Sequence, residues 1–281
     1  MSMQDWLSSL IDNTTPSKDS KALWKHFSKT YLSMRVVLFL LAFTMPLVLT
    51  LYGNIRHGLD FQPSMSAYFW AATQDQCATF PMRTIFVGYL FAVGVFVFAY
   101  KGLTGLENSL LNGAALCAFT IAIYPEHLDP KSSDPRVVQL FESCEAVHAW
   151  AELPSLPIHL TAAIILFFLL AIVALFCADK SLKYLPTEKN PEFYLWVYRI
   201  LGGLMIVFPI IGYAVAYLFN ALSNKVFFIE AAGVVTFGLY WAVKTRELSL
   251  SSLEKDPDKA VQYEKQRLSN EEQLKEQQDI H

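Results

Sequence analysis

The chain has 281 residues, of which 54% are hydrophobic and only 17% are charged. Soluble proteins carry ~25% charged residues, so the composition excludes an ordinary soluble domain and favours a membrane protein. The net charge of −3 is small, and the basic residues fall in short loops without interleaved aromatic residues. This pattern excludes a nucleic-acid-binding protein. The polar N-terminus shows no cleavable signal pattern, so we expect the first apolar run to act as an uncleaved anchor.

Residues 1–35 form a polar and aromatic segment before the first apolar run. Thr15 and Pro16 are typical of a helix N-cap and first helical position. On the helix that follows, four apolar side chains share one face, and four lysines lie elsewhere. These residues are Leu23, Trp24, Phe27 and Tyr31, and Lys18, Lys21, Lys25 and Lys29. The pattern predicts a basic amphipathic helix on the cytoplasmic membrane surface; the alternative is a lead-in to the first span.

Repeated apolar runs predict an all-α bundle of six transmembrane helices over residues 36–243. Each run approaches the ~20 residues that cross the hydrocarbon core of a bilayer. The expected spans are Val36–Gly53, Met82–Tyr100, Ser109–Tyr124, His159–Ala178, Trp196–Phe219 and Val226–Val243. Pro46 and Pro209 fall inside spans and are expected to kink them.

The basic residues near the span ends alternate between the two sides of the predicted membrane. Twelve lie on the side of the two termini and five on the other. Because cytoplasmic loops are enriched in Lys and Arg, we expect both termini inside, in a cell (inner) membrane. The outer side then holds loops 54–81 and 125–158, the second with an amphipathic helix at 137–151. Residues 244–281 form a charged cytoplasmic tail, solvated or disordered.

The four cysteines divide between the predicted spans and the outer loops. Cys117 and Cys177 fall in spans and are expected to be buried thiols. Cys77 and Cys144 lie one in each outer loop. If that compartment is oxidising, a disulfide between them would tie the loops together. The sequence leaves this pairing open, since it does not give the separation of the Cα atoms.

Polar residues converge on the outer mouth of the predicted bundle. A ligand-binding set there comprises Ser64, Tyr68, Arg83, His148 and Glu230. An acid within an apolar run costs ~2.5–3.5 kcal/mol at the bilayer centre, so Glu230 should have a partner, and Arg83 is one candidate.

A second interpretation of the same mouth is catalytic, with Ser66, His159 and Glu230 as the reactive set. Four outer histidines are enough in number for zinc. However, no paired metal-ligand spacing is present, and we expect no cofactor. The alternative for Ser64 and Ser66 is that they cap a short helix.

The motif Ser64-Met-Ser-Ala-Tyr-Phe, followed by Met82-Arg83 and Phe86-Val87-Gly88, resembles a group of uncharacterised bacterial six-span membrane proteins. Their pattern is roughly S-x-S-A-Y-x-H, then M-R-D, then F-V-G. The resemblance extends to about Lys244 and implies the fold and a bacterial inner membrane.

A more distant similarity is to the alkaline ceramidase and adiponectin-receptor-like superfamily, which comprises seven-span, zinc-dependent lipid amidases. The match maps to Ser66. In this chain Trp70 stands at the position of the His, and Thr84 at that of the Asp after Met-Arg. The zinc-ligand pattern of that superfamily is therefore degraded here.

Three functional hypotheses follow. The first is an outward-facing module that binds a membrane lipid or small amphiphile at headgroup depth. The second is a lipid-directed hydrolase, with or without a metal. The third is a structural or assembly subunit that engages a membrane or cytoplasmic protein through its tails. The span cores hold no Asp, Lys or Arg, which places a transporter below all three.

Overall fold

The computed structural model describes residues 18–72, 80–127, 158–218 and 225–255, together with the isolated positions 138, 142, 147 and 262. Within these residues the chain contains helices and no strands, which confirms the all-α prediction. Six helices are long and apolar enough to cross a membrane. Their bounds are compatible with a multi-pass membrane protein of the predicted kind.

The six spans are built from long helices, several of which change pitch near one end. α2 (Lys18–Leu47) passes through a π turn (Val48–Tyr52) into α3 (Gly53–His57). α8 (Ile158–Ile172) passes through a π turn (Val173–Cys177) into a 3₁₀ stretch (Ala178–Tyr184). The other spans are α4 (Pro81–Ala99), α5 (Gly105–Ile123), α9 (Pro191–Leu218) and α10 (Lys225–Leu250). Short pieces are η2 (Ser66–Phe69), η5 (Thr187–Lys189) and α11 (Ser252–Lys255).

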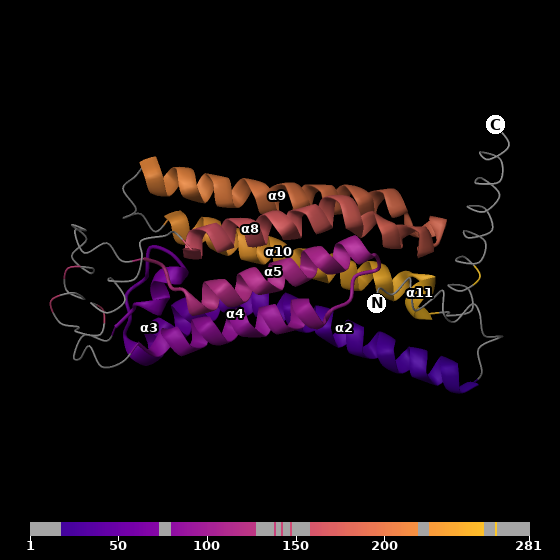
Figure 1. The fold of residues 1–281 in the computed structure, drawn as a ribbon, viewed down its shortest axis with the longest axis horizontal. Coiled ribbons are helices and arrows are strands. Elements are labelled where there is room, and N and C mark those ends of the chain that lie inside the picture. The colour runs from indigo at the N-terminus through magenta and orange to yellow at the C-terminus, as the bar shows by residue number, and fades with distance from the viewer. Residues whose placement is uncertain are drawn as a thin grey trace.

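The helices pack in chain order into a closed ring. α2 contacts α4, α4 contacts α5, α5 contacts α8, α8 contacts α9, α9 contacts α10, and α10 returns to α2. The long axes run roughly side by side, with α3 at one end of the bundle and α11 at the other (Figure 1). The connection between α4 and α5, residues 100–104, is short, whereas longer segments precede α4 and α8.

α2 runs without a break into the first span, which agrees with the alternative of a lead-in to that span. No Gly or Pro lies between Lys18 and Pro46 to interrupt it. The indole Nε1 of Trp24 donates a 2.9 Å hydrogen bond to the carbonyl of Leu253. This bond fixes the start of α2 beside the end of α10, so these two chain segments lie at the same end of the bundle.

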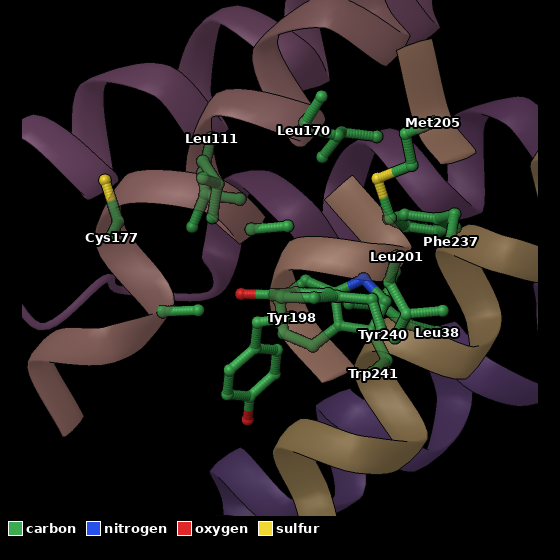
Figure 2. Packing of buried hydrophobic residues seen from close by; sticks show 14 of the residues in the cluster. Leu38, Leu111, Leu170, Cys177, Tyr198, Leu201, Met205, Phe237, Tyr240 and Trp241 are labelled. Carbon is green, nitrogen blue, oxygen red and sulfur yellow. The ribbon is translucent and has the colours of Figure 1, made fainter. Parts of the chain in front are cut away.

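The centre of the ring is filled by aromatic and aliphatic side chains from all six spans. Figure 2 shows Tyr198 of α9 beside Tyr240 and Trp241 of α10, with Leu38 of α2 close by. The ring centroids of Tyr198 and Tyr240 are 5.7 Å apart, and those of Tyr240 and Trp241 are 5.3 Å apart. Edge-to-face and tilted pairs of this kind stabilise a core beyond simple area burial.

Gly202 allows α9 to approach the π turn of α8 closely. A Cβ at this position would lie 2.7 Å from Leu175 Cγ and 3.2 Å from the Ala171 carbonyl oxygen. At the adjacent Gly203, an added Cβ would meet nothing within 4 Å. The two neighbouring glycines therefore form a matched pair for testing the packing.

We expect Gly202→Ala to lower the melting temperature of the purified protein by about 3 °C or more, because overpacking costs ~1–3 kcal/mol. Gly203→Ala is the control and should leave the melting temperature unchanged or raise it, since Ala is the better helix former. Differential scanning fluorimetry in detergent measures both. Equal melting temperatures for the two variants would contradict the α8–α9 contact.

Candidate functional site

Polar side chains gather at both ends of the bundle. We call the end with segment 58–72, Glu126, His159 and Glu230 the Ser64 end. The end with the start of α2, segment 100–104, segment 178–190 and α11 is the Arg35 end. The site predicted from the sequence lies at the Ser64 end, and the Arg35 end was not predicted as a site.

At the Ser64 end, two serines share one carboxylate that the sequence did not single out. Ser66 Oγ donates a 2.7 Å hydrogen bond to Glu126 Oε2, and Ser64 Oγ donates to the same oxygen at 3.0 Å. The two hydroxyl oxygens are 3.1 Å apart, and Ser64 Oγ also accepts from the Ala67 amide. The Trp70 indole donates to the Glu126 carbonyl at 2.9 Å. Ser64 thus binds an amide of the first turn of η2, as the capping alternative predicted for it, whereas Ser66 lies within η2. The Glu126 carboxylate accepts hydrogen bonds from both hydroxyls.

Glu230 lies one turn into α10 and holds segment 58–72 against that helix. Its Oε2 accepts the Met65 amide at 2.7 Å. Nearby, the Phe227 amide donates to the Pro63 carbonyl at 2.8 Å. The partner predicted for this acid is therefore a backbone N–H group of the segment that covers the bundle end.

Arg83 lies among three aromatic rings. Its guanidinium carbon is 4.1 Å from the ring centroid of Phe80, 4.4 Å from that of Phe69 and 5.1 Å from that of Trp70. Its Nε also donates to the Phe69 carbonyl at 3.3 Å. Within the part of the chain that the structure describes, Arg83 forms no salt bridge, so cation–π contacts take the place of the suggested pair with Glu230.

The three residues of the predicted reactive set are bonded to three different partners. Ser66 donates to Glu126 and Glu230 accepts from Met65, whereas His159 Nδ1 is 2.8 Å from the Tyr124 carbonyl oxygen. A carbonyl only accepts, so His159 Nδ1 carries the proton. Ser66 and Glu230 thus border one hydrogen-bonded cluster at the Ser64 end. His159 contacts the backbone at Tyr124, two residues before Glu126.

Of the remaining predicted residues, Tyr68 is fully buried, and burial raises the pKa of its phenol. Its ring centroid lies 6.1 Å from that of Phe227. His148, Cys77 and Cys144 lie outside the described residues. Of the expected helix at 137–151, positions 138, 142 and 147 are described; all three are helical, and Val147 is buried in the core of the Ser64 end.

Neither end contains a described metal site. Among the residues that the structure describes, no three His, Cys, Asp or Glu side chains are grouped to hold a metal ion. Cys117 and Cys177 are free thiols, the second of them buried.

At the Arg35 end, buried charges form a connected network. Glu247 Oε2 accepts from Tyr198 at 2.9 Å and from Ser181 at 3.0 Å, and lies 3.2 Å from Lys244 Nζ. Lys244 also donates to Ser181 Oγ at 2.6 Å and to the Ala178 carbonyl at 3.2 Å. The side chains of Lys244 and Glu247 are 5% and 0% exposed. Burial at this level requires paired charges, and here α10, α9 and segment 178–184 supply the partners.

A second ion pair at this end joins the first and last described helices. Arg35 of α2 donates to Glu254 Oε1 of α11. Burial raises the pKa of the Glu254 carboxyl, and Arg35 partly offsets this rise. Burial likewise raises the pKa of the neighbouring Tyr100 phenol well above its ordinary range. Tyr100 also packs edge-on against Trp241, with ring centroids 4.8 Å apart.

Between these groups lies a cavity of about 330 Å³, at the lower limit of the ~300–1,000 Å³ typical of small-molecule sites. Its walls include Trp24, Phe27, Tyr31, Leu103, Leu248 and Leu253. Four polar residues of its lining, Arg35, Glu107, Ser181 and Lys244, are at most 4% exposed. Phe27, also on the lining, is 45% exposed and lies at the mouth. The cavity therefore combines an apolar wall with a charged floor.

Sequence reasoning missed this site because it assigned the charges to loops. The sixth span was predicted to end at Val243, yet α10 continues to Leu250 and buries Lys244 and Glu247. One signal was present: Lys244 and Glu247 are spaced i, i+3, and apolar residues continue after them as Leu248 and Leu250. The contact between Arg35 and Glu254 has no such local signal.

No protein-family model matches the chain, no curated protein matches its sequence, and no solved structure matches its fold. The resemblance to the bacterial six-span group therefore stays a prediction. The candidate sites depend on the geometry alone.

At the Ser64 end, we expect Glu230→Ala to increase amide hydrogen exchange in segment 60–70 by about fivefold, because the buried Met65 amide loses its acceptor at a cost of ~1 kcal/mol. Hydrogen–deuterium exchange with mass spectrometry measures this. Glu188→Ala, at an exposed position of η5, is the control and should leave the segment unchanged. Unaltered exchange in Glu230→Ala would contradict a stabilising hydrogen bond between Glu230 and the Met65 amide.

Proposed function

We propose that this protein binds a membrane lipid or small amphiphile, and that the Arg35-end cavity is its binding site. The observation that carries the proposal is the cavity itself, whose lining combines aromatic and aliphatic side chains with buried charged groups. An amphiphile presents the complementary surface, with an apolar chain and a polar head. Sites of this kind are mostly apolar, with a few placed polar groups that fix orientation.

The orientation of the chain supports a cytoplasmic position for this cavity. Under the excess of Lys and Arg on one side, both termini face the cytoplasm of a cell (inner) membrane, and the Arg35 end lies at the inner leaflet. The first turns of α2 carry Lys25 and Lys29 on its exposed surface. Cations at this depth attract anionic headgroups of that leaflet.

The outward-facing mouth is a less favourable binding site on this geometry. Ser64, Ser66 and Glu230 are occupied by Glu126 and by the Met65 amide. We therefore assign these polar groups to holding segment 58–72 in place. A ligand at the Ser64 end would have to displace bonds already made, which costs free energy.

One observation favours a second function, a lipid-directed hydrolase at the Ser64 end. The hydroxyl of Ser66 lies 2.7 Å from a carboxylate oxygen of Glu126, a distance over which a proton can be withdrawn. A fluorophosphonate probe that labels activated serines tests this function. Labelling that disappears in Ser66→Ala supports a hydrolase, and absence of labelling excludes a serine nucleophile.

For the cavity, we expect Ser28→Trp to weaken binding of a dodecyl-chain amphiphile at least about tenfold, a loss of ~1.4 kcal/mol. Ser28 lies on the cavity lining, and an indole there would fill the space. Ser33→Trp is the matched control, because Ser33 is exposed on the same helix and should retain the wild-type affinity. Isothermal titration of protein held in amphipol measures both. Equal affinities in the two variants would refute the site.

A further inference from the structure

Among the described residues, the charged side chains around the Arg35-end cavity are not all joined in salt bridges. Lys244 has three donors, and Ser181, the Ala178 carbonyl and Glu247 take them. Glu254 is bound by Arg35. One acidic side chain of the lining belongs to neither of these two pairs.

Glu107 is that side chain. It lies in the first turn of α5, is 2% exposed and lines the cavity. Its Oε2 accepts the Leu103 amide at 2.8 Å. Among the described residues it forms no salt bridge. A buried carboxylate without a directly bonded counter-ion is costly, so this position favours a ligand that brings a cation.

Arg35 presents the opposite requirement. Its side chain is 1% exposed, and its Nε has no hydrogen-bond acceptor among the described residues. Lys101 also lines the cavity and is only half-buried, with its ammonium 5.4 Å over the ring of Phe98. An anionic group on the ligand would be attracted by both of these cations, Arg35 and Lys101.

We propose that the cavity selects an amphiphile whose head carries both an ammonium and a phosphate, with Glu107 as the counter-ion of the ammonium. The proposal rests on amphiphile binding in this cavity and specifies its substrate class. In such a head the ammonium is the terminal group and the phosphate lies between it and the alkyl chain. The ammonium therefore reaches the buried Glu107, the phosphate meets Arg35 and Lys101, and the chain leaves past the exposed Phe27.

The test compares two probes of equal chain length, dodecylphosphoethanolamine and dodecyl phosphate, by isothermal titration of the amphipol-held protein. We expect the wild type to bind the first about tenfold more tightly. Glu107→Gln should abolish this preference and leave the affinity for dodecyl phosphate unreduced. The Gln amide oxygen can still accept from the Leu103 amide, so the fold should persist. An unchanged melting temperature verifies this.

Lys101→Gln should weaken both probes by the same factor, because both carry the phosphate. Lys180→Gln is the control, since Lys180 lies at the same end, is 52% exposed and pairs with Asp179. Free phosphoethanolamine separates a soluble ligand from a lipid headgroup and should bind at least about tenfold more weakly than the dodecyl probe.

Three outcomes would overturn the headgroup assignment. They are equal affinity of the wild type for both dodecyl probes, a preference that survives Glu107→Gln, and binding of free phosphoethanolamine as tight as that of the dodecyl probe. Failure of the underlying function is recognised separately. If Ser28→Trp changes the affinity for neither probe, the cavity is not an amphiphile site. If it weakens both while the wild type does not discriminate, only the headgroup assignment fails.

Discussion

The carboxylate of Glu247 organises the Arg35 end of the bundle. It is fully buried, and a charge in that environment is tolerated only with partners close by. Those partners come from Tyr198 on α9, Ser181 after α8, and Lys244 one turn earlier on α10. Three consecutive spans of the ring must therefore meet at one point. The register of α10 against α9, and with it the floor of the cavity, follows from this requirement.

The two ends of the molecule use polar groups differently. At the Ser64 end, Glu126 and Glu230 accept hydrogen bonds from hydroxyl and amide donors of one short segment, so these donors and acceptors are paired within the protein. At the Arg35 end, Lys244 pairs with Glu247 and Arg35 with Glu254, while Glu107, also on the cavity lining, forms no salt bridge among the described residues. The first arrangement closes the end of a bundle. The second leaves room for a molecule that completes it.

The apolar runs were sufficient to predict six spans, because uncharged apolar segments of that length have few alternatives to a membrane helix. The serines and Glu230 were correctly grouped at one end, but the carboxylate that binds the serines is Glu126, which stands in a loop and has no distinguishing pattern. At the other end, Lys244 and Glu247 were taken as tail residues because charge marks span ends. Arg35 and Glu254 are 219 residues apart, so only the closed ring brings them together.

The continuity of α10 has a structural consequence. Between Glu230 and Glu247 the helix contains no proline and no π turn, in contrast to α2 and α8. This part of α10 is therefore an uninterrupted helix about 25 Å long, at a rise of 1.5 Å per residue. One tip is bonded to the segment around Met65, and the other carries the lysine of the cavity floor. A single uninterrupted helix therefore joins the two polar ends of the bundle.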